Sequence, residues 1–227
     1  MKHKHFPLIL MMVCCCTTVW AQYTYEDQDE NIQYVSWGIT AGPNLTGCRA
    51  NLDSTDGAPD RTYPALGFDV GAFLEYHITP RWSLQFAASG NILRVGTESN
   101  GLSNRLVTYG IGISVPVCYH IPVAHGSWFC TFGPYTHFVL ASSISGDGPL
   151  DNPFTRVIAN DPRTGEPQFA LNDFNAGISF SLGYEFASHW QCQLLWNWGI
   201  SDLLNVDSHE LYVKPYKLAC LIAYHFQ

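Results

Sequence analysis

A histidine and the hydroxyl groups that follow it are the residues of this chain best suited to nucleophilic chemistry. His137 precedes Ser142, Ser143 and Ser145, and an imidazole beside a serine can take the hydroxyl proton and activate the oxygen. Such a pair also needs a third group that orients the imidazole, and no residue stands at a recognisable spacing for that role. A polar histidine that faces a wet interior explains the pattern better, so we predict no catalytic residues and no enzyme.

Carboxylates gather in one long polar segment and are the candidates for binding a divalent cation. The segment 142–171 carries Asp147, Asp151, Asp161 and Glu166, and carboxylate oxygens are the ligands that Ca²⁺ prefers. Their spacing matches neither an EF-hand nor a nonapeptide repeat. We therefore expect a solvated loop, and neither a metal nor a cofactor in this protein.

The eight cysteines form no recognisable framework. Three lie in the apolar N-terminal run, and five follow it: Cys48, Cys118, Cys130, Cys192 and Cys220. An odd number without CxxC spacing argues against both a set of disulfides and a structural zinc site. Most of these five lie in apolar alternating segments, where cysteine acts as a small apolar side chain.

The N-terminus has the three parts of a secretory signal. Basic residues precede an apolar run over 6–16, and Ala21 supplies a small residue before the expected cleavage point. We predict a signal peptide over 1–21 and a flexible, acidic periplasmic leader over 22–33. A lipoprotein signal that ends at Cys14–Cys16 is the alternative.

The composition excludes several classes of protein. Charged residues make up 13% of the chain and aromatic residues 14%, whereas charged residues are about 25% of a typical soluble protein. Without the signal, nine basic residues face 19 acidic ones, so the basic surface that nucleic-acid binding needs is missing. Aromatic content argues against disorder, and no later segment has the roughly 18 consecutive apolar residues of a membrane-spanning helix. A β-rich exported protein remains.

Apolar and polar residues alternate along eight segments, which is the pattern of β-strands with two different faces. We predict strands over 34–44, 65–77, 82–93, 106–119, 128–140, 172–186, 190–200 and 212–226.

The connections between these segments alternate between short and long. About five residues join the second and third segments, about eight join the fourth and fifth (120–127), and three join the sixth and seventh (187–189). The other connections have between about 11 and 30 residues. Short turns at one end and long loops at the other are typical of an up-and-down barrel in an outer membrane. The fold class is therefore predicted as all-β, an eight-stranded antiparallel up-and-down transmembrane β-barrel over 34–227, with a soluble barrel or sandwich as the alternative.

Aromatic residues flank the short turns on the apolar face of the strands. Rings of this kind favour the headgroup zone of a bilayer, because they are apolar with one polar atom. We predict a membrane-interface girdle of Tyr76, Trp82, Tyr119, Trp128, Tyr184, Trp190, Tyr224 and Phe226. A second ring near the long loops would contain Tyr109, Phe138, Phe174 and Trp198.

The opposite face of the strands must line the lumen, and it is rich in glycine and serine. Asp69, Glu75, Glu185 and Lys217 share the inward parity. Because a buried charge needs a partner, we predict a lumen polar network of these four residues in a filled lumen, although small side chains could instead leave room for a chain of water. The histidines near the short turns, namely His77, His120, His125, His189 and His225, are interpreted as interfacial polar residues.

Several short glycine-aromatic motifs point to a known family. They are residues 37–44 (WGITAGPN), 113–119 (ISVPVCY), 132–135 (FGPY), 183–186 (GYEF) and 223–226 (AYHF). Together they resemble the outer-membrane β-barrel domain family of Bacteroidota, often labelled PorT-like, a small barrel of the OmpA/OmpX type. The resemblance implies that the protein has no catalytic residues. It also implies a C-terminal aromatic residue that the barrel-insertion machinery recognises; here Gln227 follows Phe226, so the aromatic residue is one position from the end.

These observations define the expected function. We expect a non-enzymatic outer-membrane protein with periplasmic termini and a structural or surface-interaction role through its long extracellular loops. The alternatives are a narrow, porin-like pore or an accessory component of a secretion or uptake complex, and, less favoured, a barrel enzyme that modifies lipid A or cleaves peptides. Expected partners are outer-membrane lipid and lipopolysaccharide, and no nucleic acid.

Overall fold

The computed structural model describes residues 35–51, 61–99, 102–146, 157–160, 167–169, 172–203 and 212–226. These residues belong to one compact unit, residues 33–227. The predicted signal peptide and leader lie outside the described residues. None of the described segments forms a helix that is long and apolar enough to cross a membrane.

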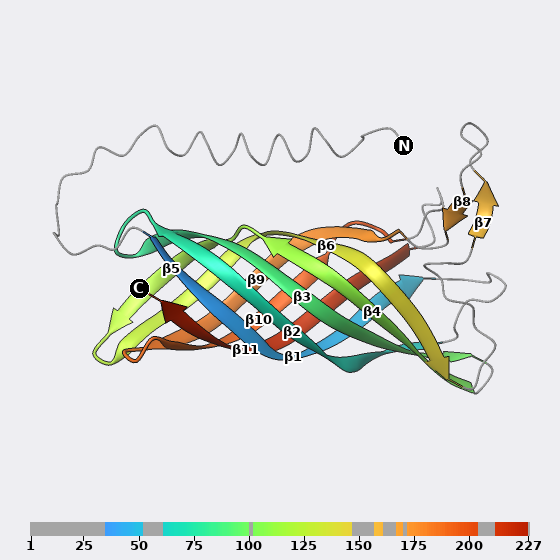
Figure 1. The fold of residues 1–227 in the computed structure, drawn as a ribbon, viewed down its shortest axis with the longest axis horizontal. Helices are drawn as coiled ribbons and strands as arrows, with labels where there is room; N and C mark the ends of the chain where they lie inside the picture. Colours follow the sequence, from blue (N-terminus) through green and yellow to red (C-terminus); the bar gives the residue numbers. More distant parts are fainter. Residues whose placement is uncertain are drawn as a thin grey trace. The chain divides into compact units, whose positions relative to one another are not determined.

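Eleven β-strands make up the described structure (Figure 1). They are β1 (Val35–Asn51), β2 (Arg61–His77), β3 (Trp82–Ser99), β4 (Leu102–Ser114), β5 (Val117–Val123), β6 (Gly126–Gly146), β7 (Val157–Asn160), β8 (Pro167–Phe169), β9 (Phe174–Phe186), β10 (Trp190–Gly199) and β11 (Tyr212–Phe226). The short strands β7 and β8 pair only with each other, and the other nine form one antiparallel sheet.

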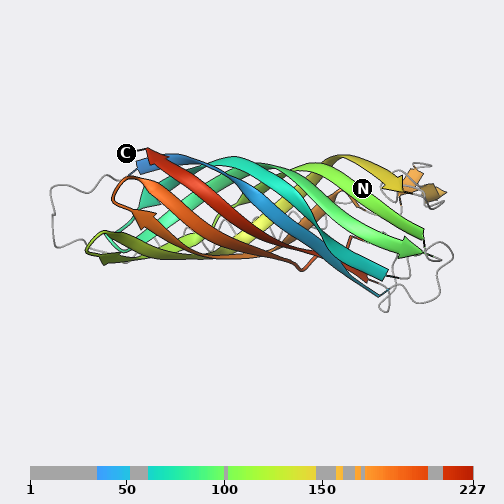
Figure 2. The same cartoon turned by 90° about the horizontal axis from the view of Figure 1, so that it is seen from below.

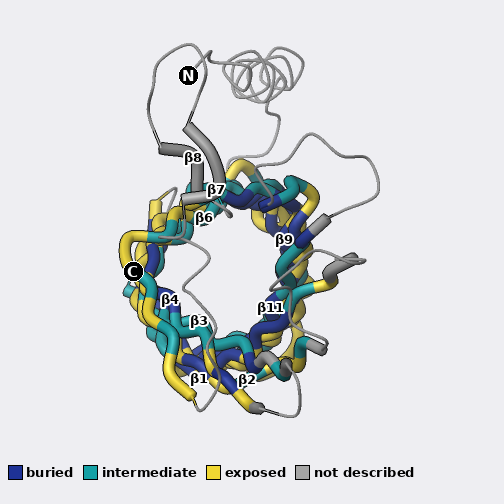
Figure 3. The backbone as a smooth tube through the Cα atoms, turned by 90° about the vertical axis from the view of Figure 1, so that its right-hand side faces the viewer, coloured by how far each residue is buried: buried dark blue, intermediate teal, exposed yellow. Residues whose placement is uncertain are grey.

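That sheet closes on itself. The first long strand, β1, pairs with β2 on one side and with the last strand, β11, on the other. The closing register places Trp37 opposite Phe226, so the beginning of β1 lies beside the end of the chain (Figure 2). Seen along its length, the sheet is a ring (Figure 3). Closure leaves no free sheet edge, which is the condition for a sheet to exist in lipid.

One of the eight positions in the ring is shared by two strands. Both β4 and β5 lie between β3 and β6, and they are separated only by Val115 and Pro116. The ladder continues through this break, because the Val115 amide donates to Pro134 at 3.1 Å and the Pro116 carbonyl accepts from Gln85 at 2.9 Å. Proline has no amide hydrogen to donate, so regular pairing is interrupted here. The ring therefore has eight strand positions, as predicted.

The eight predicted segments are confirmed as strands, but their ends are not where the alternation stops. Toward the long connections β1, β3 and β6 continue to Asn51, Ser99 and Gly146. Alternation is lost there because the outward side chains are no longer required to be apolar, while backbone pairing continues. The predicted eight-residue connection over 120–127 was wrong: only Ala124 and His125 lie between β5 and β6.

Alternate side chains face opposite sides of the ring. On β1, Trp37 and Ile39 point outward and are each 50% exposed, whereas Ser36 is buried at 3%. The outward set is dominated by large apolar side chains such as Leu66, Phe132 and Leu140. Such an apolar outer surface on a closed ring is the arrangement that lipid covers in an outer-membrane barrel.

Candidate functional site in the lumen

Two groups of polar side chains occupy the inside of the ring. The first, which we call the Asp69 cluster, consists of Asn44, Asp69, Asn91 and Lys217 from β1, β2, β3 and β11. The second, which we call the Glu75 cluster, lies at the end of the short turns. Each joins strands near the start of the ring, β2 and β3, to the last strand, β11, which closure of the ring brings close.

A single ion pair anchors the Asp69 cluster. Lys217 Nζ lies 2.7 Å from Asp69 Oδ2, and both side chains are almost completely buried. The other carboxylate oxygen, Oδ1, accepts hydrogen bonds from the Asn44 and Asn91 amides at 2.8 and 2.7 Å. Every charge in the cluster therefore has a close partner, which is what burial of an ion requires.

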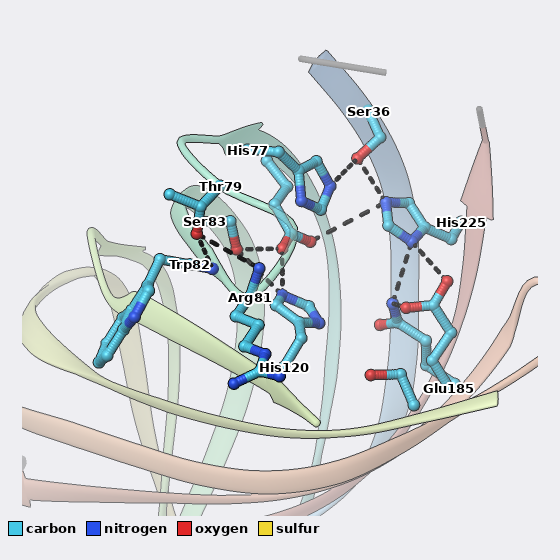
Figure 4. A network of polar contacts seen from close by, with 12 residues as sticks. Ser36, His77, Thr79, Arg81, Trp82, Ser83, His120, Glu185 and His225 are labelled. Carbon is cyan, nitrogen blue, oxygen red and sulfur yellow. Dashed lines mark hydrogen bonds and ion pairs between the residues drawn. The ribbon is translucent and has the colours of Figure 1, made fainter. Parts of the chain in front are cut away.

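The Glu75 cluster begins with a carboxylate that is only 2% exposed. His120 Nε2 donates to Glu75 Oε1 at 2.8 Å, and the Ser83 hydroxyl donates to the same oxygen. The second oxygen lies 3.9 Å from Nε2 of His225. Ser83 of β3 and His120 of β5 thus contact the carboxylate of Glu75 on β2, and His225 of β11 approaches it from the side opposite Ser83 and His120 (Figure 4).

His225 joins this carboxylate to a second one. Its Nδ1 donates to Glu185 Oε1 at 3.1 Å, and its Nε2 lies 2.6 Å from the Ser36 hydroxyl oxygen. Gln191 donates to the remaining oxygen of Glu185 at 3.3 Å. His77 completes the group, with its Nε2 at 3.4 Å from Ser36 Oγ and its ring centroid 5.7 Å from that of His120.

A cavity of about 290 Å³ lies against this cluster. Pro80, Ala187 and His189 from the turns contribute to its wall, as do His77, His120, Glu185 and His225. The cavity is therefore at the mouth of the ring formed by the short turns, and the three histidines of the cluster face it.

Aromatic rings fill the lumen next to the polar clusters. Phe73, Phe129 and Tyr135 point inward and are at most 7% exposed. Each lies over a glycine directly opposite on a neighbouring strand, namely Gly38, Gly183 and Gly177. A Cβ at Gly38 would stand 2.6 Å from Phe73 Cε1, and one at Gly183 would stand 2.8 Å from Phe129 Cε1. The inward glycines thus leave the space that these rings occupy.

The structure divides the four residues predicted to form one lumen network. Asp69, Glu75, Glu185 and Lys217 all face inward, but Lys217 pairs with Asp69 and not with the glutamates. The glutamates take imidazole partners instead.

The interpretation of the end histidines as interfacial residues was wrong for His120 and His225, which are 7% and 3% exposed and lie inside the ring. Their inward parity could have been found from the sequence, since both alternate with outward aromatic residues on β5 and β11. That signal is weak because each of them lies within a few residues of a strand end.

The aromatic residues predicted as a girdle lie together at the end of the short turns. Their rings contact one another across strands: Trp82 with Tyr119 at 4.7 Å between centroids, Trp128 with Tyr184 at 5.0 Å and Trp190 with Tyr224 at 5.2 Å. Phe226 stacks on Trp37 at 4.1 Å, and Tyr76 pairs with Val35 on β1.

The residues considered for nucleophilic chemistry do not form a pair. His137 and Ser142 lie on the same continuous strand, β6. Five residues of extended strand separate their Cα atoms by about 16 Å, and Ser143 and Ser145 are farther along. The His137 ring instead lies over Gly110 of β4.

Comparison with known proteins finds solved structures of low sequence identity. No curated protein matches the sequence. One similar solved structure is that of Ail, the attachment invasion locus protein of Yersinia pestis, in complex with the heparin analogue sucrose octasulfate. Its TM-score is 0.43 and its sequence identity 12%, and the match covers 86% of this chain and 100% of that one. Neisserial surface protein A (NspA) has a TM-score of 0.42 and 13% identity, and the match covers 84% of this chain and 97% of that one. The N-terminal β-barrel domain of OprF from Pseudomonas aeruginosa has a TM-score of 0.35 and 9% identity, and the match covers 83% of this chain and 97% of that one.

The sequence also matches the family described as outer membrane protein beta-barrel domain over residues 20–205, which is 186 of the 227 residues. This match includes seven of the eight strand positions in the ring, and the eighth, β11, closes it on β1. The chain therefore belongs to the outer membrane protein beta-barrel domain family and is a β-barrel of the outer membrane.

Proposed function

We propose that this outer-membrane barrel is not an enzyme and not a pore, and that it has a structural or surface-interaction role through its long connections. The observation that carries the proposal is the filled lumen. In a barrel of about eight strands the interior only just accommodates side chains, and here the inward positions hold paired charges and buried rings.

The lumen is blocked at more than one level. At the short turns, Glu75, His120 and His225 link β2, β5 and β11. Farther along, the Asp69–Lys217 pair bridges β2 and β11 across β1. An ion that passed through would have to break these contacts. Each buried charge left without a partner would cost about 3–5 kcal/mol.

Conductance of the purified protein in planar lipid bilayers tests this proposal. We expect current at the background level for the natural sequence. Ion flux well above background from the natural protein would refute the closed lumen and favour the narrow pore, the alternative function.

A second experiment separates a role of the loops from a role of the barrel body. Residues 147–171 would be replaced by a short turn and the variant expressed in a strain that lacks the protein. The phenotype measured would be resistance of the envelope to detergent, or adhesion. If the protein acts through its loops, the variant should fold and insert into the membrane but fail to restore the phenotype of the natural protein. Full restoration would contradict it.

Several finer properties belong to the same proposal. The barrel is a PorT-like member of the Bacteroidota branch, with a signal peptide over 1–21, a leader over 22–33 and periplasmic termini. The meeting of β1 and β11 at the end of the short turns supports the placement of the termini, because short turns are periplasmic in such barrels. The aromatic girdle would lie in lipid headgroups, the outward Phe226 would serve the insertion machinery, and the loops would meet lipopolysaccharide or an envelope secretion or uptake complex.

A further inference from the structure

Glu75, His77 and His120 form a compact set of metal-ligating groups at the mouth of the ring. Each offers one ligand atom, and the three atoms all lie within 4.8 Å of one another. We propose that these three side chains bind a divalent transition-metal ion of the Zn²⁺ type, with the cavity as the access route. The site is independent of whether the loops or the barrel body carries the function of the protein.

The spacing of the donors is close to what a metal needs. Bonds of about 2.0–2.2 Å from Zn²⁺ to imidazole nitrogen and carboxylate oxygen, in tetrahedral geometry, place the ligand atoms about 3.4 Å apart. The present separations, from 2.8 Å between Glu75 and His120 up to 4.8 Å, bracket this value. Side-chain shifts of about an ångström would therefore bring the donors to this spacing. The Nε2 proton that His120 now donates to Glu75 would be released to solvent when the metal binds.

Neighbouring residues hold the donors in place. The Ser83 hydroxyl donates to Glu75, and His225 lies 3.9 Å from the other oxygen of the same carboxylate. Metal ligands are commonly oriented by such outer hydrogen bonds, and loss of one typically lowers affinity by about 10–100-fold. Among the described residues, the hydrogen bond of the His77 ring is the long 3.4 Å contact with Ser36, so its imidazole can turn toward a metal at little cost.

The local charge also favours a cation. Two carboxylates, Glu75 and Glu185, face this end of the lumen, and the buried ammonium group of Lys217 is paired with Asp69 instead. Two imidazoles and one carboxylate are a donor set that binds Zn²⁺ and also Fe²⁺, with open positions for water. The cavity, which His77 and His120 line, leaves room for that water.

Cobalt titration of the full-length protein, purified from outer membranes in detergent, tests the proposal. We expect one Co²⁺ per protein, visible absorption of a nitrogen- and oxygen-bound tetrahedral ion, and displacement by Zn²⁺. His77→Gln and His120→Gln should each lower the affinity by at least about 100-fold, and Ser83→Ala by about 10–100-fold.

Matched variants define the control. His189 lines the same cavity but is not one of the three donors, so His189→Gln should bind as the natural protein does. Cys118→Ser should also leave binding unchanged, because Cys118 is not one of the three donors. A thiolate ligand would be recognised by intense charge-transfer bands, which a site of imidazole and carboxylate donors does not produce. Absence of binding at millimolar Co²⁺, thiolate bands, or equal affinity in all variants would overturn the proposal.

A measurement on the natural sequence covers the case in which His77→Gln or His120→Gln fails to fold. Histidine side-chain NMR resonances would be recorded with and without Zn²⁺. The signals of the other histidines that follow the predicted signal peptide would be assigned with the variants His125→Gln, His137→Gln, His189→Gln, His209→Gln and His225→Gln. Shifts in the two imidazoles of His77 and His120 support the site. Shifts in neither of them, or equal shifts in every histidine, would contradict it.

Discussion

Replacement of Lys217 by methionine should destabilise the folded barrel by leaving Asp69 as a buried charge without its counter-ion. Methionine keeps the length and most of the apolar volume of the lysine side chain, so packing against the lumen wall is preserved. The change therefore isolates the 2.7 Å contact between Lys217 Nζ and Asp69 Oδ2.

The expected size of the effect follows from the partners that remain. Removal of one member of a buried ion pair costs about 3–5 kcal/mol. Asp69 keeps the amide hydrogen bonds of Asn44 and Asn91 at 2.8 and 2.7 Å, and hydrogen bonds to a charged group are each worth about 1.5–3 kcal/mol. Because these bonds still stabilise the carboxylate, we expect a loss at the low end, about 3 kcal/mol in the free energy of unfolding.

Urea titration in lipid vesicles, followed by tryptophan fluorescence, measures this loss under conditions where unfolding is reversible. The double variant Lys217→Met with Asp69→Asn should be more stable than the sum of the single effects predicts, by about 2 kcal/mol, because neither charge is then left alone. Arg105→Met, at an exposed position on β4, should change stability by no more than about 0.5 kcal/mol. A loss below about 1 kcal/mol for Lys217→Met, or strictly additive effects, would refute the assignment of a stabilising pair.

Three further predictions concern the lumen wall and the outer face. Gly183→Ala places a Cβ 2.8 Å from Phe129 Cε1 and 2.7 Å from the Cys192 carbonyl oxygen, and should lower the free energy of unfolding by about 1–3 kcal/mol. Gly90→Ala, whose Cβ would have no atom nearer than 3.9 Å, should leave it unchanged or slightly raised. In variants that keep a single tryptophan, Trp190 should be quenched best by lipids brominated near the headgroup. Trp196 lies about 20 Å farther along the tilted strand, which is about 15 Å in depth, and should be quenched best by lipids brominated near the bilayer centre. The outward, exposed thiol of Cys192 should resist a polar maleimide while the barrel is in lipid and react once it is unfolded.

Each of these outcomes has a result that would contradict it. Equal stability losses for the two glycine variants would mean that space over Gly183 is not what the lumen rings require. Equal quenching depths for the two tryptophans would argue against a girdle at the short turns. Fast labelling of the Cys192 thiol in intact vesicles would place the outer face of β10 in water.

The sequence by itself determined the number of strand positions, their order and the two faces of each strand. Alternation is a local property, so it shows which residues share a face wherever one side must be apolar. Glycine and serine on the other face, with Asp69, Glu75, Glu185 and Lys217 among them, identified the inward set without any knowledge of contacts. The fold class followed because the connections alternate in length.

Only the tertiary structure decided which inward residues meet. Glu75 and His120 are 45 residues apart, and His225 is farther still. Their approach depends on the stagger between neighbouring strands, which accumulates around the ring and which no local pattern contains. For the same reason Lys217 meets Asp69 and not a glutamate.

The strand ends and the interruption between β4 and β5 also depended on the whole structure. Backbone pairing can continue after the apolar pattern has ended, and Pro116 keeps its place because Gly133 on the neighbouring strand leaves it room. A pattern confined to one strand carries no information about its neighbour. Contacts between strands, and therefore the histidine and carboxylate group at the mouth of the ring, arise only when the sheet closes.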